Sequence, residues 1–211
     1  MGSLLRILGL LVLATLPVSG YGVAWEQSAD AGYLRSGDLK AFKQVIQNDK
    51  ENKYKNPQLI IEALSTGITS GNVELIQYLA SLGWLDECRK VEYCKPVHFA
   101  AVYGRVGVIR FLLSQGFDVN AVTGPTAAGG GGKNSALHMA ANKGHIGAVV
   151  FLCEQGVDPD LRNERKRTAL GEAKYTSSVR SLGATKKEDA RKRADVAKVI
   201  EYLESGQCKK K

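Results

Sequence analysis

The stretch PVHFAAVYGRVGVIRFLLSQGFDVNA (Pro96–Ala121) decides the fold, because its pattern returns in ALHMAANKGHIGAVVFLCEQGVDPDL (Ala136–Leu161). Each stretch has a histidine, a pair of alanines, a glycine, an apolar run and a second glycine twelve residues after the first. Self-similarity of this kind is the signature of a repeat architecture, in which each unit is one supersecondary structure. The sequence therefore predicts a stack of related units.

Weaker copies of the same frame lie on both sides of these two. SGNVELIQYLASLG (70–83) keeps both glycines, SGDLKAFKQVIQND (36–49) keeps the first, and TALGEA (168–173) has Gly171 where the histidine is expected. A unit of this size cannot bury its apolar face alone, so at least three must stack. The first glycines of successive copies are 34, 33 and 40 residues apart, at Gly37, Gly71, Gly104 and Gly144.

The apolar residues inside the units recur with helical spacing. In the second half of each unit they stand three residues apart, which places them on one stripe of an α-helix. The first half is short and rich in alanine, so the two helices of a unit are expected to approach closely. The stripe residues are Val73, Ile76 and Leu79; Val106, Ile109 and Leu112; and Ile146, Val149 and Leu152.

Two tetrads resemble the start of a known repeat. Lys95-Pro96-Val97-His98 and Ser135-Ala136-Leu137-His138 are similar to the tetrad that opens the ankyrin repeat, whose period is 33 residues. The resemblance implies an all-α solenoid of helix-turn-helix units with β-hairpin fingers, in which both histidines form structural hydrogen bonds. The predicted ankyrin domain covers 33–206, with copies near 33–56, 57–90, 91–122, 134–163 and 167–206.

The first twenty residues have the pattern of an export signal. Arg6 precedes a short apolar run, and small residues stand before the cleavage that we expect after Gly20. The alternative is an uncleaved amphipathic N-terminal helix. With a signal peptide at 1–20, residues 21–32 are a linker and 207–211 a basic tail, and no later segment is long and apolar enough to span a membrane. We therefore expect a protein of the secretory pathway, either secreted or periplasmic.

Two insertions break the period. Residues 122–133 contain a glycine run, which predicts a mobile finger that either closes over a partner or is a tolerated surface insertion. The second insertion, at about 178–193, lies inside the last copy. KKEDARKRADVAKVIEYLES (186–205) is rich in helix formers and predicts a long, charged C-terminal helix that caps the stack with a polar outer face.

Four cysteines follow the export signal. Cys88 and Cys94 flank a predicted finger, where an oxidising compartment would favour a disulfide between them; the alternative is two free thiols. Cys153 stands where the preceding copy has Leu113, so it is predicted to be a buried apolar side chain. Cys208 is unpaired in this scheme, and is either inert or linked to another chain.

The excess of positive over negative charge is confined to the C-terminal region. Residues 1–161 hold 14 basic and 14 acidic side chains, whereas 162–211 hold 15 and 7, which accounts for the net charge of +8. Such asymmetry suggests an anionic partner, although charge runs are usually solvated surface. The alternative function is therefore binding of a polyanion or an anionic membrane. The residues predicted for it are Arg165, Lys166, Arg167, Lys192 and Arg193.

No arrangement of residues in the sequence indicates catalysis. No phosphate-binding, hydrolase or metalloprotease motif occurs, so we expect no enzyme. Cys88, Cys94 and His98 lie close in sequence but match no zinc spacing, so neither a metal site nor a cofactor is predicted.

The resemblance to ankyrin repeats implies a function in protein binding. Members of that family bind partner proteins on the concave face made by the fingers and the first helices, so we expect a non-enzymatic interaction scaffold outside the cytosol. The oligomeric state is open, with a monomer as the expectation. The residues predicted to contact the partner are Val102, Tyr103, Arg105, Lys133, Asn134, Asn142, Lys143 and His145.

Overall fold

The computed structural model describes residues 39–40, 43–44, 57–91, 94–124, 132–179 and 185–209, and for 57–62 it describes the backbone alone. The predicted signal peptide and linker, most of the first copy and the glycine run of the finger lie outside these residues. The boundaries predicted for the copies therefore stay predictions.

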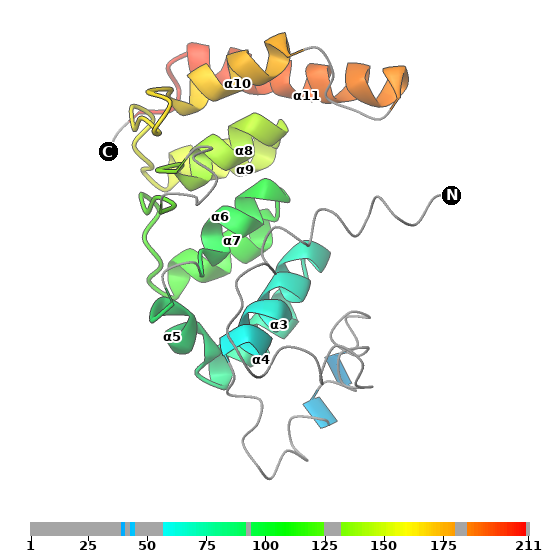
Figure 1. Ribbon diagram of the computed structural model, residues 1–211, viewed down its shortest axis with the longest axis vertical. Coiled ribbons are helices and arrows are strands. Elements are labelled where there is room, and N and C mark those ends of the chain that lie inside the picture. The colour runs from blue at the N-terminus through cyan, green and yellow to red at the C-terminus, as the bar shows by residue number, and fades with distance from the viewer. Residues whose placement is uncertain are drawn as a thin grey trace, which may run out of the picture.

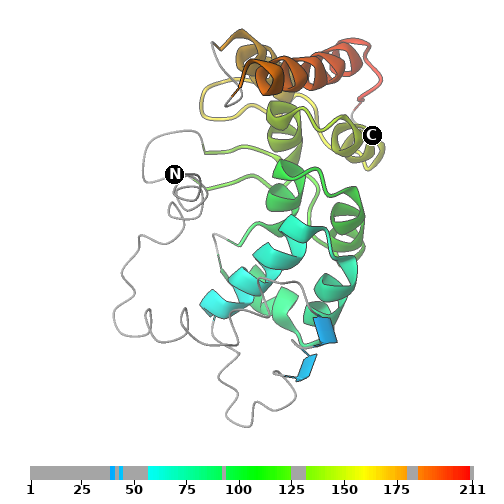
Figure 2. The ribbon, with the colours of Figure 1, turned by 90° about the vertical axis from the view of Figure 1, so that its right-hand side faces the viewer.

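Within the described residues the chain forms helix pairs that stack in chain order (Figure 1). The pairs are α3 (Pro57–Ser70) with α4 (Val73–Ser81), α6 (Pro96–Val102) with α7 (Val106–Ser114), α8 (Ala136–Lys143) with α9 (Ile146–Glu154), and α10 (Ala169–Ser178) with α11 (Lys186–Glu204). The first helices contact one another along the stack, α3 with α6, α6 with α8 and α8 with α10, and α7 contacts α9. The second view shows the same layering (Figure 2). The all-α, ankyrin-like prediction is confirmed at this level.

Local sequence signals set where the first helices begin. Pro96 occupies the first turn of α6, where the missing N–H costs nothing and the fixed φ suits a helix. Ser135 caps α8 and Thr168 caps α10, each with a side-chain oxygen that accepts a backbone N–H three residues on. These caps satisfy donors that would otherwise lack partners at the helix ends.

The core lies between the helix pairs, as the periodicity predicts. Ile109 and Leu112 of α7 and the equivalent Val149 and Leu152 of α9 have no solvent exposure. The alanine pairs of α6 and α8 are also fully buried, which allows the first helices to pack closely. The apolar stripes are therefore buried both within each helix pair and against the neighbouring pairs.

The finger predicted around residues 88–94 is wrong in its secondary structure. Residues Trp84–Arg89 form a helix, α5, instead of a β-strand. Trp84, Leu85 and Cys88 are its buried residues, and their spacing of one and four places them on one helical face. The apolar residues of this segment thus have helical rather than alternating spacing, and the sequence reasoning followed the family pattern instead. The disulfide itself is present, between Cys88 and Cys94 with Cα atoms 5.4 Å apart.

The finger between α7 and α8 is described only at its base. Val122 and Ser135 form an isolated antiparallel bridge, and Lys133 N donates to Thr123 O at 2.8 Å. This bridge is the extent of β-pairing in the described parts of the chain, so a full β-hairpin is not confirmed.

The prediction that Cys153 is buried is confirmed, but the prediction that Cys208 is unpaired is wrong. Cys153 is buried in α9, but it is bonded to Cys208, with Cα atoms 4.9 Å apart. After Gly206 the chain folds back against α9, which the sequence spacing of 55 residues did not reveal. In the chain-entropy view, closing a loop of this length stabilises the folded state by on the order of 4 kcal/mol. The tail is thereby fastened to the fourth copy.

The turn glycines allow successive copies to approach. Gly104 has φ 64° and Gly144 has φ 75°, a left-handed conformation that favours glycine. A Cβ on Gly104 would lie 2.7 Å from the His145 ring of the next copy, and one on Gly144 would lie 3.0 Å from the Val196 nitrogen of α11. The second glycine of the frame differs, because a Cβ on Gly116 would meet nothing within 4 Å.

This difference yields a matched test of repeat stacking. Gly104→Ala and Gly116→Ala both place alanine at a positive φ, which costs roughly 1–2 kcal/mol. Gly104→Ala also displaces His145, so it should destabilise the protein by about 1–3 kcal/mol more than Gly116→Ala. Urea unfolding of both variants measures the difference. Equal losses would show that the contact across the stack contributes nothing.

Candidate partner-binding surface

Two of the predicted binding residues fasten one copy to the next. Arg105 and His145 precede α7 and α9, and neither caps its own helix with its side chain. Instead Arg105 Nε donates to Thr69 O at 3.1 Å, and His145 Nε2 lies 2.9 Å from Val102 O. These carbonyls stand at the end of the preceding first helix, where the helix itself offers no donor. Both side chains thus complete the helix of the preceding copy.

Two predicted asparagines also bond within the stack. Asn142 Nδ2 donates to Thr176 Oγ1 at 2.8 Å, which joins α8 to α10. The Asn134 side chain accepts from Asn163 Nδ2 at 2.9 Å, which joins two successive loops. Their amide groups are therefore engaged by the protein itself.

The remaining predicted residues include three exposed side chains. Tyr103 is 42% exposed at the end of α6, and its ring packs edge-on against Phe99 with centroids 5.1 Å apart. Lys143 at the end of α8 and Lys133 before α8 are exposed as well. Val102 is half-buried, so it contributes less surface.

Sequence reasoning missed three residues that extend this surface. Phe99 and Met139 are half-buried at equivalent positions of α6 and α8, and Tyr175 of α10 is 48% exposed. The repeat register contained the signal for Phe99 and Met139, because each lies three residues before an assigned residue of the same helix, whereas no residue of α10 had been assigned. We define the first-helix face as Phe99, Tyr103, Met139, Lys143 and Tyr175.

The histidines of the two tetrads are structural. His98 Nε2 lies 2.9 Å from Ala121 O, and His138 Nε2 lies 2.9 Å from Arg167 O. Burial lowers the pKa of His98 from its ordinary value of 6.5 to about 4 and also lowers the pKa of His138. Both are therefore neutral at pH 7. The described residues hold no group of three or more side chains arranged for a metal ion.

Most of the residues predicted to bind a polyanion are paired within the protein. On α11, Lys192 pairs with Glu188 and Arg193 with Asp189, each one turn away. Arg193 also donates to Val179 O at 2.6 Å, just after α10. The cations of α11 thus support the helix and its contact with α10.

Arg167 belongs to a buried network. Its Nε donates to Glu172 Oε1 at 3.0 Å, and Glu172 is 5% exposed. Asn163 donates to the same carboxylate at 2.6 Å. A buried carboxylate needs such partners, so this network stabilises the start of α10. Arg165 and Lys166 lie in the same loop with exposed side chains.

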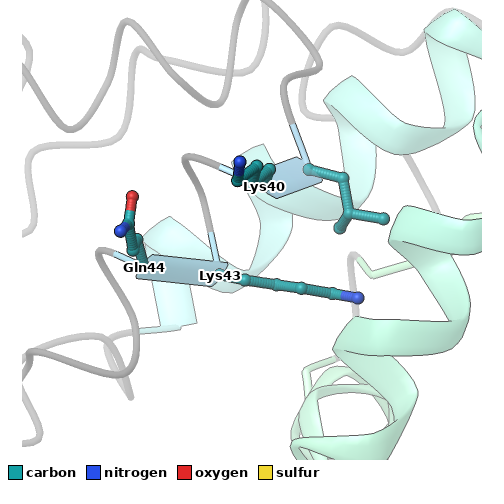
Figure 3. A pocket seen from close by; sticks show the side chains of 4 residues that line it. Lys40, Lys43 and Gln44 are labelled. Atoms are coloured by element: carbon teal, nitrogen blue, oxygen red, sulfur yellow. The ribbon is translucent and has the colours of Figure 1, made fainter.

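A shallow pocket lies at the N-terminal end of the described residues. Leu39, Lys40, Lys43 and Gln44 line it (Figure 3). Lys43 Nζ lies 5.0 Å from the centre of the Tyr78 ring of α4, a cation–π contact. The four lining residues include no carboxylate, imidazole, thiol or hydroxyl group.

Comparison with known families agrees with this geometry. A family model described as the ankyrin repeat matches residues 94–124 and 132–164. These residues form ankyrin repeats. The matched segments contain the α6–α7 and α8–α9 pairs, where the contacts between copies are clearest. No curated protein matches the chain significantly. Ankyrin repeats generally mediate protein–protein interaction.

No helix within the described ranges combines the length and the apolar character needed to cross a bilayer.

Because Arg105 bonds to the preceding copy, its replacement should lower the stability of the fold and not only partner binding. Arg105→Ala leaves Thr69 O without its donor, so we expect about 1–3 kcal/mol of destabilisation. Lys143→Ala, at an exposed position, should change the free energy of unfolding by less than about 0.5 kcal/mol. Chemical unfolding compares the two. Equal effects would contradict the structural role of Arg105.

The pKa of His98 predicts acid sensitivity. Because the folded pKa of about 4 lies below the unfolded value of 6.5, the unfolded chain binds the proton first as pH falls. Stability should be complete above pH 6.5 and decline towards pH 4, by roughly 3 kcal/mol from this group. His98→Gln should flatten that decline, even if it lowers stability at pH 7. An unchanged pH slope in the variant would refute the assignment.

Proposed function

We propose that the protein is a non-enzymatic scaffold that binds a partner protein on the first-helix face. The main observation behind this proposal is that some side chains along this part of the stack bond to neighbouring copies while others next to them are exposed to solvent. Arg105, Asn142 and His145 bond to neighbouring copies, while Tyr103 and Lys143 remain exposed beside them. A face held in place by such bonds loses little conformational entropy on association.

The composition of the face suits a protein ligand. Tyrosine is enriched at binding hot spots because it offers a large, stiff contact area with a polar end. Two tyrosines of the face, Tyr103 and Tyr175, are among the exposed large apolar side chains of the described residues. Ankyrin repeats act generally in protein–protein interaction, which supports the same conclusion.

We further propose that the protein acts outside the cytosol. The Cys88–Cys94 and Cys153–Cys208 bonds suit an oxidising compartment, where disulfides persist. The predicted signal peptide points the same way. In this proposal α11 is the terminal cap, since its outward side chains are charged and its buried residues are Val196 and Val199.

The proposal predicts which substitutions abolish binding without unfolding the protein. Tyr103→Ala with Lys143→Ala should reduce capture of the cross-linked partner from the native compartment by about tenfold or more. Arg105 is retained in this variant because of its bond to Thr69. Quantitative mass spectrometry of the captured partner is the measurement.

The matched control is Leu82→Ala. Leu82 is 37% exposed and is the C-cap residue of α4, a second helix. The substitution therefore removes exposed apolar surface at a position outside the first-helix face. Its capture should equal that of the unaltered protein. Full capture by the Tyr103 and Lys143 variant, or an equal loss in the Leu82 variant, would refute the assignment of this face.

A further inference from the structure

Four exposed basic side chains lie on two adjacent loops of the described chain. One loop is the base of the finger before α8, and the other connects α9 to α10. The loops carry like charge at the edge of the stack, next to the first helices. We define the finger-edge patch as Lys133, Arg162, Arg165 and Lys166.

Hydrogen bonds hold the two loops side by side. Gly132 N donates to Glu164 Oε2 at 2.8 Å, and Glu164 N donates to Gly132 O at 3.1 Å. On the other side of Lys133, Asn134 accepts from Asn163 Nδ2 at 2.9 Å. Lys133 is therefore flanked by residues that are bonded to the second loop. Its position beside that loop is fixed by its neighbours, not by its own amine.

Two lysines of the patch occupy an unfavourable backbone conformation. Lys133 and Lys166 both have φ 59°, and they are the non-glycine residues with positive φ in the described ranges. Glycine adopts this conformation without strain, and lysine does not. Fold stability thus favours glycine at both positions. The charge of these side chains is the property that glycine would lack.

The nearby acidic side chains, Glu164 and Glu172, accept hydrogen bonds from groups other than the two lysines. Glu164 accepts from the Gly132 backbone, and the buried Glu172 accepts from Arg167 and Asn163. Within the described residues neither Lys133 nor Lys166 forms an ion pair. On α11, by contrast, Lys192, Arg193 and Lys198 form ion pairs with acids three or four residues away. The patch, with four basic side chains beside Glu164, therefore has an excess of positive charge.

The geometry points to an acidic segment of the partner protein as the ligand of the finger-edge patch. This inference rests on the proposed function and specifies the chemistry of the partner. Arg167, in the same loop, lies over the Tyr175 ring at 4.0 Å, which connects the patch to the first-helix face. A segment with carboxylates beside apolar residues would contact both surfaces. A long polyanion gains most from an extended run of cations, whereas Lys192, Arg193 and Lys198 of α11 are already paired with acids.

The test uses Lys133→Gly with Lys166→Gly in the full chain. Glycine relieves the strain, so the melting temperature should not fall. Binding of a labelled oligo-glutamate peptide at low ionic strength should weaken by about tenfold or more, and added salt should weaken binding to the unaltered protein. The charge-matched control, Lys186→Gln with Lys198→Gln on α11, should bind the peptide normally.

Each other outcome overturns the inference. The assignment fails if the unaltered protein does not bind the peptide, or if the glycine variant and the α11 control bind it equally well. Tighter binding of a heparin fragment or of phosphatidylserine vesicles, lost in the glycine variant, would replace the acidic protein segment with a polyanion or membrane. Capture of the native partner separates the two proposals: capture lost with Tyr103 and Lys143 replaced, but retained in the glycine variant, supports the proposed function and refutes this inference.

Discussion

The structure depends on the contact between the turn of one copy and the residue that precedes the second helix of the next. Gly71 and Gly104 leave room for Arg105 and His145, whose side chains then reach the last carbonyls of the preceding first helix. A carbonyl at a helix end has no partner within its own helix, so the neighbouring copy supplies one. Burial of the apolar stripes stabilises the stack in bulk, and these bonds set its register.

The binding surface follows from this arrangement. Polar side chains that point along the stack bond to the neighbouring copy, and side chains one or two positions away, at the ends of the first helices, remain exposed to solvent. Tyr103, for example, lies two residues before Arg105, and the two have different surroundings. A rigid face with exposed tyrosines and lysines is therefore a consequence of how the copies are joined.

Much of the fold could be predicted from the sequence, because it rests on local periodicity. The glycine frame, the stripe at Ile109 and Leu112, and the tetrad histidines all match the structure. Long-range contacts could not be predicted in this way. The Cys153–Cys208 bond depends on how the chain turns after α11, and the helix at Trp84–Arg89 departs from the family pattern.

The candidate site was predictable only as a region. Register placed Tyr103 and Arg105 together, but it gave no sign that the Arg105 guanidinium turns towards Thr69. Whether a side chain bonds to a neighbouring copy or faces solvent depends on the approach of that copy. The patch at Lys133 and Lys166 likewise arises from loop contacts 32 residues apart in sequence.

Native-state hydrogen exchange in a His145→Ala variant tests the dependence between copies most directly. His145 lies in one copy and Val102, its acceptor, in the copy before. If the copies are stable only together, the amides of α6–α7 and of α8–α9 should lose the same free energy of protection. Loss confined to α8–α9, with α6–α7 unchanged, would show that the copies are independently stable and would contradict the account.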